Sequence, residues 1–170
     1  VAAVISVVML LRSEEKLRIH KQSIPGLFLR SFFGTVGLIC NFYAVDRLNI
    51  ADANILNKLS PFFAIIMSYF ILKEKANIIE WICVAAAFAG AVFVVKPSMN
   101  MQFVYALIGV CGGFGAGVAY TFVRKLGQSG ERGPVIVMFF SVFSCIVTLP
   151  FMIIEYEPMS AIQLIFLLLA

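Results

Sequence analysis

Charged residues are scarce in this sequence, and the side chains that build most catalytic and metal sites are nearly absent. Asp, Glu, Lys and Arg make up only 13% of the 170 residues, whereas about a quarter is usual for a soluble domain. His20 is the only histidine, so a Ser-His-Asp triad, an HExxH site or a His-rich metal site is not indicated. We therefore expect no metal, no cofactor and no enzymatic activity.

The cysteines Cys40, Cys83, Cys111 and Cys145 show no CxxC or Cys/His spacing. Each stands alone in an apolar run, which favours small packing residues over disulfides or zinc ligands. The net charge of +4 would suit a nucleic acid in a soluble protein. Here the basic residues fall between apolar runs and no nucleic-acid-binding motif occurs. We expect a lipid bilayer as the partner, and no nucleic acid.

Apolar residues are abundant. Hydrophobic residues make up 62% of the sequence, and the mean hydropathy is +1.00. A soluble domain of this size has too little interior to bury them, whereas lipid accepts apolar surface without penalty. The sequence therefore predicts an all-α fold, a polytopic transmembrane helix bundle.

Five apolar runs have about the 20 residues that a membrane-spanning helix needs. They are residues 26–45, 53–72, 77–95, 102–123 and 134–154. The apolar runs 1–11 and 161–170 are too short to cross about 30 Å of hydrocarbon at about 1.5 Å per residue. We interpret both as helices cut by the ends of the sequence, which makes the chain a fragment of a larger protein.

Lys and Arg gather in alternate connections, which predicts the orientation of the spans. One side holds ten of them: Arg12, Lys16, Arg18, Lys21, Arg30, Lys73, Lys75, Arg124, Lys125 and Arg132. The other side holds Arg47 and Lys96, and Lys58 falls within a span. The ten-residue side, with loops 12–30, 73–76 and 124–133, is expected to be cytoplasmic in a cell membrane.

The most informative polar residues lie in the second complete span. They share the spacing i, i+3, i+4, i+7 of one helical face: Asn54, Asn57, Lys58 and Pro61. Lys58 lies about 12 Å along the helix from Ile50, and charge at that depth marks functional sites. This face would offer two amides and an ammonium to a polar or anionic solute. Alternatively, Lys58 extends outward and pairs with Asp46 or Asp52.

Three further features have both a structural and a functional interpretation. Pro61 breaks its helix, and such breaks either build transport sites or are simple kinks. Asn41, near Tyr43, either bonds another helix or contacts a solute. Gly109, Gly113 and Gly117 recur every four residues, which favours close helix packing. Alternatively, they widen a solute path with Tyr120 on its wall.

The order of several short segments resembles the EamA-type family of drug/metabolite transporters. The segments are Asn-Phe-Tyr-Ala at 41–44, Ala-Asp-Ala at 51–53, Leu-Ser-Pro-Phe-Phe-Ala at 59–64, Leu-Lys-Glu at 72–74 and Gly-Val-Ala-Tyr-Thr-Phe-Val-Arg-Lys at 117–125. Glu74 follows Pro61 by thirteen positions, as an acidic residue does in that family. Gly90 and Pro97 match its fifth helix.

The resemblance implies ten helices in two inverted five-helix repeats, with this chain running from the end of helix two to the start of helix eight. Residues 1–98 would then belong to the first repeat and 99–170 to the second. The family's topology also puts the loop between helices two and three in the cytoplasm. Lys58 departs from the family's pattern and would favour carboxylated or phosphorylated solutes.

We therefore expect a secondary transporter that moves small metabolites, amino-acid-like or otherwise polar or anionic, across the plasma membrane by alternating access. The expected cavity residues are Asn41, Tyr43, Asn54, Asn57, Lys58 and Tyr120. A homodimer is compatible with the sequence but not indicated by it. Two rival hypotheses are a scaffold or assembly subunit without a solute path and a membrane-embedded enzyme. The enzyme would need clustered His, Asp, Glu or Cys, which the sequence lacks.

Overall fold

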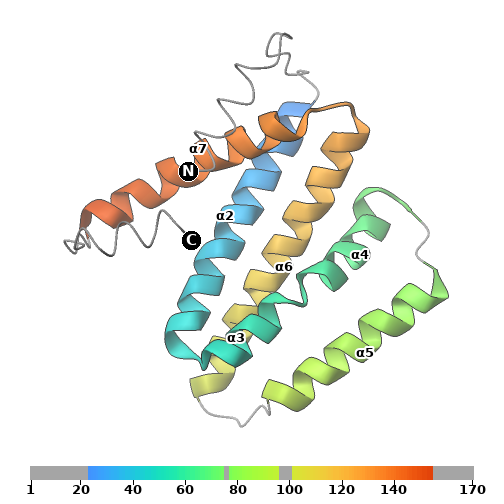
Figure 1. The fold of residues 1–170 in the computed structure, drawn as a ribbon, viewed down its shortest axis with the longest axis vertical. Helices are drawn as coiled ribbons and strands as arrows, with labels where there is room; N and C mark the ends of the chain where they lie inside the picture. Colours follow the sequence, from blue (N-terminus) through green and yellow to red (C-terminus); the bar gives the residue numbers. More distant parts are fainter. Residues whose placement is uncertain (1–22, 75–76, 96–100, 155–170) are drawn as a thin grey trace.

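The computed structural model describes residues 23–74, 77–95 and 101–154, and these form six helices (Figure 1). The helices are α2 (Ile24–Arg47), α3 (Ile50–Asn57), α4 (Ser60–Ile71), α5 (Ile78–Val95), α6 (Met101–Gln128) and α7 (Gly133–Ile154). The described residues contain no strand, so the predicted all-α fold is confirmed. The end runs 1–11 and 161–170 and His20 lie outside the described residues.

Helices α2 and α6 lie side by side at the centre of the bundle (Figure 1). Gly37 makes this close approach possible, because a Cβ atom built there would lie 2.9 Å from both Ala116 N and Gly112 O. The same holds for Gly115 on α6, where a Cβ atom would lie 2.9 Å from the carbonyl oxygen of Phe33 on α2. The two backbones therefore touch without intervening side chains, an arrangement that small residues allow between membrane helices.

The second expected span, 53–72, corresponds to the apolar segment Ile50–Ile71 and is broken into two helices. Helix α3 ends at Asn57 and α4 begins at Ser60, with Lys58 and Leu59 between them. Pro61 sits in the first turn of α4. Its ring has no N–H and would clash with the carbonyl four residues earlier in a continuous helix. That carbonyl belongs to Asn57, which explains why α3 ends at Asn57, one turn before Pro61.

The glycines spaced by four on α6 face this broken segment. A Cβ at Gly109 would lie 2.9 Å from the Leu56 side chain, and one at Gly113 would lie 2.8 Å from the Leu56 carbonyl oxygen. At Gly117 the Cβ would lie 2.8 Å from the carbonyl oxygen of Ser60. Helix α6 thus presents glycines on two faces, one toward α2 and one toward α3 and α4.

Side-chain hydrogen bonds add to these contacts between helices. Thr121 on α6 donates to the Ala64 carbonyl on α4 at 3.2 Å. The hydroxyls of Thr35 on α2 and Ser144 on α7 lie 2.8 Å apart. Helix α7 crosses α2 obliquely in Figure 1. The bond between Thr35 and Ser144 therefore joins α7 to the rest of the bundle. Hydroxyl bonds of this kind stabilise helix association in lipid, where water does not compete.

The start of α2, the segment after α4 and the end of α6 meet at one end of the bundle. Arg124 forms an ion pair with Glu74 at 3.0 Å, and Gln128 donates to the same carboxylate at 3.1 Å. A Cβ at Gly26 would lie 3.1 Å from the Leu126 side chain, so the start of α2 adjoins the end of α6. This meeting agrees with the alternation of basic loops. The cytoplasmic assignment of that end stays a prediction.

Four segments are long and apolar enough to cross a membrane: Ile24–Arg47, Ile50–Ile71, Phe103–Gln128 and Gly133–Pro150. The apolar part of the remaining span, Ile78–Phe93, is shorter. Large apolar side chains are exposed on several helices, including Phe42, Phe70 and Ile146. Exposed apolar surface of this extent suits contact with lipid, and the protein is a multi-pass membrane protein.

Replacing Gly37 by Ala should destabilise the bundle by about 1–3 kcal/mol, because the added methyl group meets backbone atoms that cannot rotate away. The measurement is thermal unfolding of the full-length protein in detergent. Gly90→Ala on α5 is the matched control, because a Cβ there meets no described atom within 4 Å. Equal melting temperatures for the two variants would contradict the backbone contact of α2 with α6.

Candidate functional site

A cavity of about 240 Å³ lies beside the crossing of α2 and α6. Its lining includes Arg30, Asn41, Asn57, Tyr120 and Phe140. These side chains come from α2, α3, α6 and α7, so four helices from both ends of the described chain converge there. The cavity combines one cation, two amides and one phenol with the face of an aromatic ring.

One face of α2 supplies half of the lining. Arg30, Gly34, Gly37 and Asn41 all border the cavity, and their spacing of i, i+4, i+7, i+11 places them on a single helical face. The two glycines between the polar residues leave room where side chains would otherwise fill the space. The same helical face therefore provides both the close contact with α6 and the polar groups beside it.

Arg30 is the charged residue of the cavity. Its guanidinium carbon lies 3.8 Å from the centre of the Phe140 ring, at the distance of a cation–π contact. Its Nε and Nη1 atoms are buried and form no hydrogen bond within the described part of the chain. A Cβ at Gly34 would lie 3.0 Å from Nη1, so this glycine makes space for the guanidinium.

The depth of Arg30 makes its position informative. It lies six residues after Ile24, the start of α2, which is about 9 Å along the helix axis. A charge within a spanning helix is energetically costly and marks a site of binding or transport by default. The cation–π contact offsets part of that cost, but it leaves N–H donors without acceptors.

Three of the six expected cavity residues are brought together: Asn41, Asn57 and Tyr120 all line the cavity. The other three are not among its lining residues. Asn54 and Lys58 are exposed, and no ion pair of Lys58 occurs among the described residues. Tyr43 is also exposed, with its ring centre 6.1 Å from that of Tyr105.

Arg30, Gly34 and Phe140 were not among the residues expected from the sequence. Arg30 had been assigned to the cytoplasmic charges because it follows a basic loop. The available signal was its spacing to Gly34, Gly37 and Asn41, since a cation three helical turns before an amide, on a face of glycines, is unusual in a span. Phe140 carried no signal, because seventeen phenylalanines occur in the chain.

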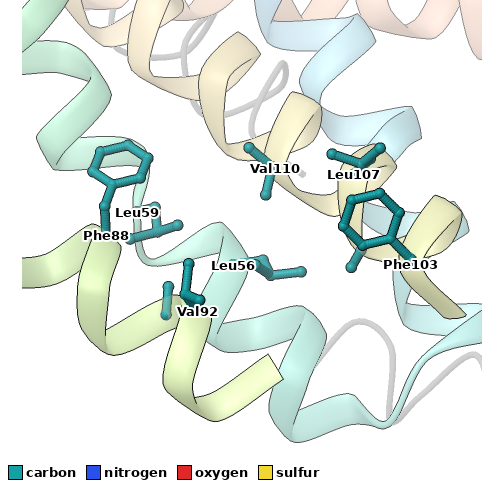
Figure 2. A pocket seen from close by; sticks show the side chains of 9 residues that line it. Leu56, Leu59, Phe88, Val92, Phe103, Leu107 and Val110 are labelled. Carbon is teal, nitrogen blue, oxygen red and sulfur yellow. The ribbon is translucent and has the colours of Figure 1, made fainter. Parts of the chain in front are cut away.

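A second cavity, of about 170 Å³, lies between α3, α5 and α6. Figure 2 shows that the side chains around it, among them Leu56, Val92 and Phe103, are apolar. Such a lining has no group to orient a polar solute by hydrogen bonding. The cavity beside α2 is therefore the better candidate for polar chemistry. Across residues 23–74, 77–95 and 101–154, no three His, Cys, Asp or Glu side chains are grouped for a metal ion.

Comparisons with known proteins agree with the architecture. The model of the EamA-like transporter family matches residues 1–96. The pseudopaline exporter CntI of Pseudomonas aeruginosa is 32% identical over 84% of this chain and 50% of its own length. An uncharacterized transporter of Helicobacter pylori is 25% identical over 73% of the chain and 42% of its own length.

Another relative is solute carrier family 35 member G1 of Mus musculus. It is 28% identical over 61% of the chain and 32% of its own length. The chain thus spans half or less of the length of these curated relatives. No solved structure matches it.

Water should reach the cavity beside α2 but not the apolar cavity. In a variant whose native cysteines are replaced by Ala, we expect Asn57→Cys to react with a charged methanethiosulfonate reagent at least ~10-fold faster than Val92→Cys, because thiolates form only where water solvates them. The measurement is the rate of labelling in membranes. Similar slow rates at both positions would contradict an aqueous polar cavity.

Proposed function

This chain belongs to the EamA-like transporter family, and we propose that it forms part of a secondary carrier for small polar or anionic solutes, amino-acid-like metabolites included. The carrier would work in the plasma membrane by alternating access. The observation that supports this most is the polar cavity beside the crossing of α2 and α6. It lies among helices that otherwise present apolar side chains to lipid.

The chemistry of the cavity suits a polar solute. The amides of Asn41 and Asn57 each offer donors and acceptors, and the Tyr120 hydroxyl offers one of each. Such groups discriminate against solutes that leave them unpaired on binding. A hydrophobic solute would therefore bind poorly here, although it would fit the apolar cavity near Leu56 and Val92.

The position of the cavity suits alternating access. We propose that residues 1–98 and 99–170 belong to two repeats, as the family resemblance implies. The cavity would then lie between α2 and α3 of the first repeat and α6 and α7 of the second. The backbone contact at Gly37 would act as the pivot between them. The ion pair of Glu74 with Arg124 would join the repeats at one membrane face and separate when that face opens.

The relatives' names support the coarse function. One is named as an exporter of pseudopaline and another as a solute carrier, so movement of a solute is common to both. We extend that activity to this chain as a proposal. The side chains of Asn41, Asn57 and Tyr120 gather around one cavity, which favours a carrier over a scaffold without a solute path.

Removal of one cavity hydroxyl should slow transport. Full-length protein in liposomes would be assayed for uptake of labelled glutamate, glutamine, succinamate, succinamide and erythritol. For each solute that the wild type moves, we expect Tyr120→Phe to reduce uptake about 2- to 10-fold, which corresponds to one hydrogen bond.

Tyr69→Phe is the matched control. Tyr69 is exposed on α4 against Trp81, away from the cavity, and its loss of a hydroxyl should leave uptake unchanged. Equal uptake by the wild type and both variants would show that the Tyr120 hydroxyl does not contact the solute during transport. Absence of uptake of every solute by the wild type would contradict the proposed function itself.

A further inference from the structure

We propose that Arg30 is the anion-binding group of the cavity and that the solute presents a single carboxylate to it. This inference rests on the proposed transport function and names the class of solute. The starting observation concerns the guanidinium group of Arg30. Arg30 Nε and Nη1 are buried without a hydrogen-bond partner in the described part of the chain.

No carboxylate forms an ion pair with Arg30 within the described part of the chain. The lining of the cavity contains no Asp or Glu. Asp46 pairs with Arg47 at 3.1 Å, and Glu74 pairs with Arg124. Buried guanidinium N–H groups without an acceptor are unfavourable, because their desolvation is not offset by a partner. A bound anion would supply that partner, which gives the cavity an affinity for negative charge.

The guanidinium is held in a defined plane. It lies over the Phe140 ring at 3.8 Å, and Gly34 leaves the space that its Nη1 atom occupies. A planar donor group fixed by stacking loses little side-chain freedom when an anion binds. Guanidinium and carboxylate groups have matching geometry for paired hydrogen bonds.

The balance of charge favours a carboxylate over a phosphate. Arg30 contributes one positive charge, and the other polar lining groups, Asn41, Asn57 and Tyr120, are neutral amides and a phenol. One carboxylate neutralises one guanidinium. A phosphate monoester carries about 1.5 to 2 negative charges at pH 7 and would leave excess charge within the membrane, which is unfavourable.

The neutral groups would bind the rest of the solute. Asn41 lies on the same face of α2 as Arg30, and Asn57 and Tyr120 border the same cavity. Their amides and hydroxyl would form hydrogen bonds with the polar groups of the solute other than its carboxylate. Lys58, the cation expected from the sequence, is exposed and outside this lining.

The test compares two solutes that differ by one charge. Succinamate carries one carboxylate, and succinamide replaces it with a neutral amide of the same shape. Binding would be measured by thermal stabilisation of the purified full-length protein, and uptake by liposomes that contain it. The variants are Arg30→Gln, which removes the charge, and Arg30→Lys, which keeps it. Arg47→Gln is the matched control, because Arg47 lies on the same helix at its exposed end.

For the wild type we expect stabilisation and uptake with succinamate but not with succinamide. Arg30→Gln should weaken succinamate binding about 10- to 100-fold, as expected for a charge-assisted hydrogen-bonded pair. Arg30→Lys should retain part of the binding, and Arg47→Gln should retain all of it. Inorganic phosphate should compete weakly.

Several outcomes would overturn the inference. Equal binding of succinamate and succinamide, tighter binding of phosphate, or no effect of Arg30→Gln would each do so. If Arg30→Gln lowered the melting temperature without solute and weakened all solutes alike, Arg30 would instead be a structural residue. Uptake of succinamide or erythritol by the wild type with none of succinamate would refute the carboxylate while leaving the carrier function intact. Failure to move any solute would refute the carrier function.

Discussion

The contact between the backbones of α2 and α6 is the constraint on which the rest of the structure depends. At Gly37 there is no room for a Cβ atom between Ala116 N and Gly112 O. Lipid gives no hydrophobic drive for two apolar helices to associate, so close packing of this kind is the main source of their attraction. The polar cavity lies directly beside this contact, on the same glycine-bearing face of α2.

Helix α6 connects this contact to the broken segment of α3 and α4. Its second glycine face receives the carbonyl oxygens of Leu56 and Ser60 at Gly113 and Gly117. Glycines carry no side chain, so these carbonyl oxygens can approach α6 closely. The break therefore lies against α6, and Asn57, the last residue of α3, lines the same cavity as Asn41.

Much of the architecture could be predicted from the sequence because apolar run length and basic-residue alternation report directly on the bilayer. The side chains of the cavity were harder to predict. Asn57 and Lys58 were expected on one face, yet successive residues differ by about 100° around a helix, and only Asn57 reaches the cavity. Arg30 was missed because a count of Lys and Arg residues per loop does not show how far along a helix each charge lies. Its partner ring, Phe140, comes from a different helix, and one sequence does not show that pairing.

The central claim is that a carboxylated solute binds at Arg30, in the cavity beside the α2–α6 contact. The most direct test is an experimental structure of the full-length protein with saturating succinamate. We predict solute density within hydrogen-bond distance of the N–H groups at the edge of the Arg30 guanidinium, with the ring of Phe140 still against one face of that group. Density beside Lys58 instead, or in the apolar cavity near Leu56, would contradict it.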